Sequence, residues 1–345
     1  MDLDGKVAIV TGASRGVGAA AALALGAAGA RVACAARATD AQPLPLPGTI
    51  DGTVRAIQDA GGDALAVPTN LAVDDEVAAM VTTTEAHYGR VDILVNNAAI
   101  TFPGDVDLPM KRYDLIFAVN TRAPLIAIQT ALPGMRARGE GAILNVSSLA
   151  ALNYFPTQMA YGMSKIALEH LTVSLATQLL DDRIPVNTFR IDVPVASEGF
   201  VYNSPGVDIS DWEPTEVAAE GILWMLRQPP EYTGNNVGMA ALRDEQGIMA
   251  TRPGGTTVCV GAPPIDQGIS LPGVVAFGAQ EKRLIGCLLG SVHAQRDIPR
   301  LLALWQAGRL DLEGMITHRM PLEQTEDALD LMRNRTGLRT VLSVA

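Results

Sequence analysis

The sequence is poor in the residues that build metal centres and disulfide frameworks. Its 345 residues include three cysteines and four histidines, and no group of them has the spacing of metal ligands. We therefore expect no bound metal. An odd number of cysteines fits a reducing compartment, so we predict a cytoplasmic protein. Cys34 falls in an apolar segment, where a cysteine usually acts as a small core side chain.

The sequence also lacks an excess of positive charge and a long apolar run. The formal net charge is −11, which argues against nucleic acid or an anionic membrane as a partner. The longest uncharged apolar run, Gly16–Ala30, is too short to span a bilayer. The first residues, Met1-Asp2-Leu3-Asp4, do not resemble a signal peptide, so none is expected. The sequence contains no internal repeat or low-complexity tract. These absences are typical of a soluble enzyme that acts on a small molecule.

A glycine-rich turn near the N-terminus is the first positive signal. The segment predicts strand Lys6–Thr11, a turn with Gly12, Gly16 and Gly18, helix Ala19–Ala30 and strand Arg31–Ala36. The spacing G-x-x-x-G-x-G differs from the G-x-G-x-x-G of the dinucleotide fingerprint, but the physical role is the same. Glycines let the main chain approach a pyrophosphate at a helix N-terminus, where free N–H groups and the helix dipole favour an anion.

Three residues in one short segment point to proton-transfer chemistry. Tyr161 and Lys165 are one helical turn apart and share a helix face. An ammonium beside a phenol favours the phenolate, so we expect the pKa of Tyr161 to be lowered toward working pH. Ser148 ends the apolar strand AILNVSS, from which its hydroxyl can point into the same pocket. The alternative is that Tyr161 and Lys165 form a solvated surface pair of no catalytic importance.

Strands and helices alternate along the first two thirds of the chain. Residues 38–48 contain three prolines in ATDAQPLPLPG and are expected to be irregular. The further predicted elements are helix Thr49–Ala60, strand Asp63–Pro68, helix Asp74–Tyr88, strand Val91–Asn96, helix Thr121–Arg138, strand Ala142–Ser147, helix Gln158–Leu180, strand Pro185–Ile191 and helix Glu213–Arg227. This alternation predicts an α/β fold of the Rossmann type, a doubly wound parallel sheet with right-handed crossovers.

The motifs together resemble the short-chain dehydrogenase/reductase family over about residues 1–250. The resemblance rests on TGASRGVG, NNAA at 96–99, Asn120, Ser148, Tyr161 and Lys165, in this order and at these intervals. It implies that Tyr161 is the general acid/base and that Ser148 orients the substrate oxygen. Lys165 would lower the pKa of the tyrosine and bind the nicotinamide ribose. Asn120 would support a water-linked proton relay, or it would simply be a helix-kink asparagine. Asn96 would help to hold the central strand.

The resemblance also implies a nicotinamide cofactor site. Its expected residues are Gly12, Ser14, Arg15, Gly16, Val17, Gly18, Arg37, Asn70, Leu71, Asn97, Ala98, Lys165 and Val193, with Asn70 at the adenine. Members that prefer NAD place a carboxylate at the end of the second strand, where this chain has Ala36, followed by Arg37. Arg15 and Arg37 suit a 2′-phosphate, so NADP(H) is expected over NAD(H). The alternative is that both arginines are ordinary surface residues. The insertion 38–48 resembles that of hydroxysteroid-dehydrogenase-like members and would lie near the adenosine.

Two stretches lie near the expected nicotinamide pocket. The first departs from the family pattern, and the second corresponds to a part that the family usually has. Where the family usually has Pro-Gly, this chain has Ile191 and Asp192, and that carboxylate could perturb pKa values near hydride transfer. Residues 197–212 correspond to the substrate lid. Three aromatic side chains in this lid suggest an apolar substrate, or they simply pack the lid itself: Phe200, Tyr202 and Trp212.

The C-terminal third resembles a different family. The segments TRPGGTTVCVGAP, EKRLIGCLLGS and the residues from 296 onward resemble the last part of zinc-type medium-chain alcohol dehydrogenases. The parts of that family with the zinc ligands and its own glycine turn have no counterpart here. We therefore divide the chain into a catalytic domain, 1–252, and a non-catalytic α/β appendage, 253–345. Its expected elements are strands Thr256–Val260 and Leu284–Leu289 and helix Ile298–Ala307. Arg339 matches an arginine that touches the cofactor in that family but lacks the rest of the site here. No metal-ligand pattern surrounds Cys259, Cys287, His293 or His318.

The resemblance implies an NADP(H)-dependent oxidoreductase that interconverts a small-molecule carbonyl and an alcohol. An alternative is a non-catalytic NADP(H)-binding interaction or sensor protein. In this alternative the appendage and the altered Ile191-Asp192 turn have abolished catalytic activity. Members of the family often assemble through their long helices, here Thr121–Arg138 and Gln158–Leu180. We expect a homodimer or homotetramer, with the dimer favoured because the appendage follows the last strand.

Overall fold

The computed structural model describes residues 1–246, the segments 256–260, 283–287, 318–321 and 340–343, and residues 324, 325, 327 and 330. These residues belong to two compact units. Residues 1–246 lie in the first unit, and the four later strands lie in the second.

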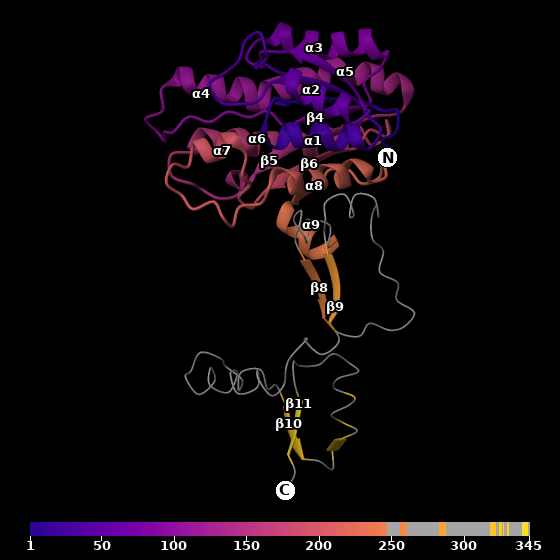
Figure 1. Cartoon of the computed structure of the whole chain (residues 1–345), viewed down its shortest axis with the longest axis vertical. Helices are drawn as coiled ribbons and strands as arrows, with labels where there is room; N and C mark the ends of the chain where they lie inside the picture. Colours follow the sequence, from indigo (N-terminus) through magenta and orange to yellow (C-terminus); the bar gives the residue numbers. More distant parts are fainter. Residues whose placement is uncertain are drawn as a thin grey trace. The chain divides into compact units, whose positions relative to one another are not determined.

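The first unit is built on a seven-stranded parallel sheet (Figure 1) with the order β3-β2-β1-β4-β5-β6-β7. The strands are β1 (Val7–Thr11), β2 (Arg31–Ala36), β3 (Asp63–Pro68), β4 (Ile93–Asn96), β5 (Ala142–Ser148), β6 (Val186–Ile191) and β7 (Asn236–Gly238). The central strands are short apolar runs: every residue of β1 is buried, as is every residue of β4. Strands covered on both faces have this pattern, and the predicted doubly wound α/β fold is confirmed.

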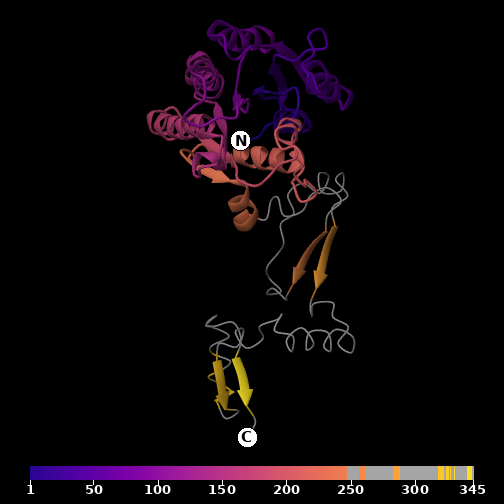
Figure 2. The same ribbon diagram turned by 90° about the vertical axis from the view of Figure 1, so that its left-hand side faces the viewer.

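Helices cover both faces of the sheet (Figures 1 and 2). Their bounds are α1 (Gly16–Ala27), α2 (Ile50–Asp59), α3 (Asp74–Tyr88), α4 (Met110–Phe117), α5 (Ala123–Arg138), α6 (Met159–Gln178), α7 (Glu198–Tyr202), α8 (Thr215–Arg227) and α9 (Met239–Gln246). Apolar side chains of α1, α2 and α8 form one core cluster with the sheet, and those of α3, α5 and α6 form another. These two clusters form most of the core, and a small third one contains Leu108, Ile116 and Ala160.

Several elements differ from the sequence prediction. Helix α1 begins at Gly16 rather than at Ala19, so two of the three turn glycines belong to its first turn. The helix expected at Thr121–Arg138 begins as α5 at Ala123 and is preceded by α4, which was not predicted. A π turn, Ala118–Arg122, joins α4 to α5. Helix α1 also ends at Ala27 rather than at Ala30, and the short helices α7 and α9 were not predicted. The other bounds in the first unit shift by only a residue or two.

One helical run in the described part, Met110–Arg138, is 29 residues long and apolar enough to cross a membrane by length and composition alone. It consists of α4, the π turn and α5. Its α5 portion packs against α3 and β4, and Ala127, Ile128, Ala131 and Met135 are buried in the core. We therefore interpret this run as a core helix of the domain.

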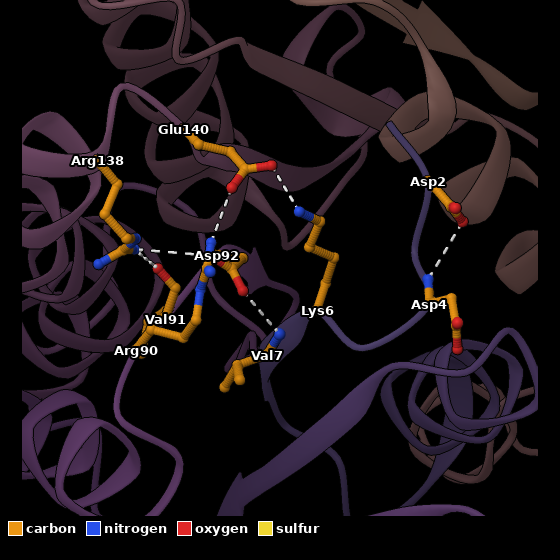
Figure 3. Close-up of polar contacts among 9 residues, drawn as sticks. All are labelled: Asp2, Asp4, Lys6, Val7, Arg90, Val91, Asp92, Arg138 and Glu140. Atoms are coloured by element: carbon orange, nitrogen blue, oxygen red, sulfur yellow. Dashed lines mark hydrogen bonds and ion pairs between the residues drawn. The ribbon is translucent and has the colours of Figure 1, made fainter.

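An ion-pair cluster ties together the amino ends of β1 and β4 (Figure 3). Its members are Lys6, Arg90, Asp92, Arg138 and Glu140. The Asp92 side chain is 0% exposed, and its carboxylate accepts hydrogen bonds from the Val7 N–H at 3.0 Å and from Arg90 Nε at 2.7 Å. Glu140 pairs with Lys6 and Arg90, and the hydrogen bond from Lys6 is the main reason that its pKa is lowered. The cluster lies at the edge of the sheet opposite the carboxyl ends of the strands, so we assign it a structural role.

The described strands of the second unit form two separate parallel pairs, which Figure 2 shows in orange and yellow. β8 (Thr256–Val260) pairs with β9 (Arg283–Cys287), and β10 (His318–Pro321) pairs with β11 (Thr340–Ser343). The first pair matches the two strands predicted there, with β9 ending earlier than expected. The expected helix 298–307, His293 and Arg339 lie outside the described residues. Among the residues that are described, no group of three or more His, Cys, Asp or Glu side chains could hold a metal ion.

Candidate active site at the carboxyl ends of the strands

The glycine turn between β1 and α1 packs closely on itself and on the loop after β4, and only glycine fits there. Gly12 has a φ of +72°, and a Cβ there would lie 3.0 Å from the Ala98 Cα. A Cβ on Gly18 would lie 2.3 Å from the Gly12 carbonyl oxygen. Arg15 precedes α1 as its N-cap residue but makes no side-chain capping hydrogen bond, and the first turn of α1 has no acidic residue. The N–H groups of this helix end are thus available to an anion, which fits the pyrophosphate of a dinucleotide.

The beginning of the expected lid lies against this turn. A Cβ on Gly16 would lie 3.1 Å from the Ser197 Cβ and 3.5 Å from Glu198 Oε2. Ser197 accepts a hydrogen bond from the Phe200 N–H, which caps the short helix α7. The carboxylate of Glu198 therefore lies beside the anion-binding end of α1. A bound pyrophosphate and this carboxylate would repel each other at close range.

Arg15 anchors the proline-rich insertion. Its Nε donates to the Pro47 carbonyl at 2.7 Å, and its Nη2 donates to the Leu46 and Gly48 carbonyls at 2.9 and 3.1 Å. Burial is the main reason that the pKa of Arg15 is lowered, and the charge of Arg37 acts in the same direction. Arg37 itself is exposed, directly after β2. Both arginines thus lie where the sequence predicts the ribose, but much of the Arg15 hydrogen-bonding capacity is used by the insertion.

The remaining expected cofactor residues follow other strands of the same sheet edge. The Asn97 N–H and the Ala98 N–H both donate to Thr11 Oγ1, and Asn97 Nδ2 donates to the Thr11 carbonyl at 2.9 Å. Asn70 uses its side-chain oxygen to accept from the Ala72 N–H, which shapes the turn after β3. The other members also lie next to strand ends or in the first turn of α1: Ser14, Val17, Leu71 and Val193. In open α/β sheets, ligands bind outside the carboxyl ends of the strands.

Ser148, Tyr161 and Lys165 come together at this edge. Ser148 is the last residue of β5, and its side chain lies close enough to that of Tyr161 on α6 to influence the pKa of the phenol. Lys165 is only 2% exposed. Its Nζ donates to the Val146 carbonyl at 2.8 Å and lies 5.7 Å from the centroid of the Tyr161 ring. Lys165 is therefore buried beside a strand end and Tyr161 is half-buried, so the two are not a solvated surface pair.

The pKa of Tyr161 shifts in the direction opposite to the one predicted. Burial raises it, and the hydrogen bond with Ser148 only partly opposes this effect. Burial also lowers the pKa of Lys165 to about 8, although the charge of Glu169 acts to raise it. The prediction considered the attraction between an ammonium and a phenolate and neglected the cost of removing both groups from water.

Asn120 lies in the π turn, and its side chain is fully engaged. Its Oδ1 accepts from the Ile100 N–H at 2.8 Å, while its Nδ2 donates to the Ile100 carbonyl and to Ser164 Oγ. These bonds tie the loop after β4 to α6, one residue before Lys165. Asn96 donates to Asn145 at 2.9 Å across β4 and β5, which is the structural role that the sequence suggested. Helical π turns occur often at functional sites.

The unusual Asp192 points toward α9. Its Oδ1 accepts a hydrogen bond from the Ala240 N–H at 3.0 Å, in the first turn of that helix. A Cβ on Gly238 would clash with its Oδ2 at 1.9 Å. The carboxylate thus caps α9, where it satisfies an N–H group and interacts favourably with the helix dipole.

Exposed apolar side chains gather on the loops around the site. Phe200 stacks on Trp212 with ring centroids 4.5 Å apart, while Tyr202 is 69% exposed. Sequence reasoning missed the two loops after β4 and β5, where Val106, Leu152, Tyr154 and Phe155 are exposed. Asp105 joins these loops, since its Oδ2 accepts from the Tyr154 hydroxyl at 3.1 Å and from the Thr157 N–H at 3.0 Å. No local sequence pattern marks this contact, because it joins residues from separate loops.

Comparison with known proteins agrees with this geometry. A family model described as short chain dehydrogenase matches residues 6–192. Hydroxysteroid dehydrogenase-like protein 2 of Xenopus tropicalis is 33% identical over 257 residues, which cover 71% of this chain and 59% of the relative. The chain thus matches about three fifths of that relative's length.

Two solved structures of similar fold contain a nicotinamide cofactor. A metagenomic short-chain oxidoreductase in complex with NADP is 32% identical with a TM-score of 0.58, covering 69% of this chain and 97% of that one. A 7α-hydroxysteroid dehydrogenase in complex with NADH and 7-oxo glycochenodeoxycholic acid is 27% identical with a TM-score of 0.62, covering 69% and 94%. The cofactors of these neighbours differ, so they support a nicotinamide dinucleotide without choosing between the two. The chain belongs to the short-chain dehydrogenase/reductase family of NAD(P)-dependent oxidoreductases.

Proposed function

We propose that this protein interconverts a carbonyl and an alcohol with NADP(H), using Ser148, Tyr161 and Lys165. The observation that carries the proposal is the buried Lys165, whose Nζ lies 5.7 Å from the centroid of the Tyr161 ring at the end of β5, where Ser148 lies. These residues share a sheet edge with the uncapped N-terminus of α1, where the pyrophosphate would bind. A bound nicotinamide would supply or accept the hydride.

The residues of the chain would carry the proton. In reduction, the Tyr161 O–H bond breaks and its proton passes to the carbonyl oxygen, which becomes the alcohol hydroxyl. Ser148 donates a hydrogen bond to the same oxygen and stabilises the negative charge that develops there. The Lys165 ammonium stabilises the phenolate that remains. Oxidation of the alcohol follows the same path in reverse, with Tyr161 taking up the proton.

The substrate is proposed to be apolar. The support is the group of exposed apolar side chains on the lid and on the loops after β4 and β5, because such residues favour apolar ligands at a pocket rim. The direct test is NADPH consumption with matched ketones and aldehydes that carry either alkyl or charged substituents. Turnover of the alkyl series supports the proposal. Cofactor binding without any turnover would instead favour the non-catalytic binding protein.

NADP(H) is proposed over NAD(H) because β2 ends on Ala36 rather than on a carboxylate, and because the exposed Arg37 follows directly. Arg37→Asp is expected to weaken NADPH binding by about 1–3 kcal/mol more than NADH binding, since it replaces a phosphate partner with a repelling charge. Fluorescence titration with both cofactors measures the difference. Arg31→Asp makes the same charge change at the other end of β2 and should leave both affinities unchanged. Equal affinity of the wild-type protein for NADH and NADPH would refute this preference.

Residues 253–345 are proposed to be a medium-chain-dehydrogenase-like appendage with no catalytic group. Deletion of this segment should leave the turnover of the remaining protein within about twofold, since every proposed catalytic residue lies before it. We also propose that it buries its apolar strands against the catalytic domain or a second subunit of a dimer. The deletion should therefore change the subunit count in light scattering or lower solubility. Unchanged mass and solubility would show that the segment has no structural role.

A further inference from the structure

A buried ion pair lies behind the proposed catalytic lysine. Glu169 on α6 and Arg190 on β6 make two hydrogen bonds: Arg190 Nε to Glu169 Oε1 at 2.9 Å and Arg190 Nη2 to Glu169 Oε2 at 2.6 Å. Their side chains are only 10% and 12% exposed. This fork-to-fork arrangement fixes the carboxylate in place. Paired charges this far from water are costly, so the pair calls for an explanation beyond stability.

Glu169 lies one helical turn after Lys165 on the same face of α6. Side chains at this spacing have Cβ atoms about 5–6 Å apart, and both residues are buried, at 8% and 2% exposure. The charge of Glu169 acts to raise the pKa of Lys165. β5 carries no charged side chain, and β6 contributes Arg190. The charged residues of α4 and the π turn that packs on α6 are exposed: Lys111, Arg112, Asp114 and Arg122.

We infer that Glu169, held by Arg190, is a positioning residue for Lys165: its fixed carboxylate stabilises the ammonium charge on which the proposed proton transfer depends. The inference rests on the proposed function, because it assigns Glu169 a role in that same reaction. Glu169 itself touches neither substrate nor cofactor. It acts through Lys165, and Arg190 acts through Glu169.

The balance of charge and burial explains why such a residue is needed. Burial lowers the pKa of Lys165 to about 8 even with the Glu169 carboxylate present. Without this carboxylate the lysine would lose its proton nearer to neutral pH, and a neutral amine stabilises a phenolate poorly. Glu169 therefore extends the pH range over which Lys165 is charged.

The four lysines of the sequence, Lys6, Lys111, Lys165 and Lys282, make a direct test practical. Protein labelled with carbon-13 at the lysine Cε can be titrated by NMR, and the Lys165 signal is assigned by its loss in Lys165→Arg. Glu169→Gln is expected to lower the pKa of Lys165 by about one unit or more, and Glu169→Asp should restore part of this shift. Asp181→Asn removes an exposed carboxylate just beyond α6 and should change nothing. An unchanged Lys165 titration in Glu169→Gln overturns the inference.

A second variant covers the case in which Glu169→Gln does not fold with Arg190 left unpaired. Glu169→Met with Arg190→Met replaces both charges by apolar groups of similar length, a change that buried pairs often tolerate. It should lower the pKa of Lys165 as well, and a normal titration here would also overturn the inference. The NMR experiment requires no turnover, so its failure is distinct from failure of the proposed function. In an active enzyme, the alkaline limb of kcat/KM should move to lower pH by the same amount.

Discussion

Replacement of Tyr161 by phenylalanine should lower turnover by about a hundredfold or more while leaving cofactor affinity unchanged. The variant loses only the hydroxyl that would pass its proton to the carbonyl oxygen, and it retains the ring beside Lys165. The loss should appear in both kcat and kcat/KM, because the proton moves in the transition state. NADPH oxidation measures turnover, and fluorescence titration measures affinity.

A matched tyrosine provides the control for this result. Tyr88 ends α3, and its hydroxyl donates to Asp63 at 3.0 Å, away from the carboxyl edge of the sheet. Tyr88→Phe removes the same atom and should retain activity. If Tyr161→Phe kept the activity of the Tyr88→Phe variant, the proposed role of Tyr161 would be wrong.

Replacement of Asp92 by alanine should cost about 3–5 kcal/mol in the free energy of unfolding. The substitution leaves Arg90 and Arg138 without their buried carboxylate and removes the acceptor of the Val7 N–H (Figure 3). Urea unfolding gives the measurement. Activity per folded molecule should not change, because the cluster lies at the amino ends of the strands.

An exposed ion pair provides the control for the change in unfolding free energy expected of Asp92→Ala. Glu231 and Arg183 lie 3.9 Å apart with side chains 75% and 68% exposed, and such pairs contribute little to stability. Glu231→Ala should therefore unfold almost as the wild type does. A comparably small effect of Asp92→Ala would show that the cluster is not a structural tie.

The sequence predicts the parts of this protein that depend on local pattern. Apolar strands buried on both faces, the glycine turn and the Tyr161–Lys165 spacing all follow from neighbours in the chain. Helix α4 was missed because MKRYDLIF is only eight residues long, too short for a clear helical pattern. The first turn of α1 was missed because glycine usually ends helices, whereas Gly16 and Gly18 here form the beginning of one.

The contacts that refine the site join distant residues, and no local pattern reveals them. In the sequence, Glu169 looks like an ordinary polar residue of a helix. Only the structure shows that Arg190 on β6 is hydrogen-bonded to it. In the sequence, Asp192 is only a departure from the family turn. The structure shows that its carboxylate accepts a hydrogen bond from the Ala240 N–H and so caps α9. Each pairing depends on register between elements far apart in sequence, which composition and periodicity do not encode.

The anchoring of the proline-rich insertion by Arg15 has a consequence for engineering cofactor preference. Its three hydrogen bonds to the Leu46, Pro47 and Gly48 carbonyls mean that mutating Arg15 removes a cation and releases a loop at the same time. A change in affinity after such a mutation would mix electrostatics with loop order. A library for switching between dinucleotides should therefore vary Arg37 and its neighbours and retain Arg15 as part of the scaffold.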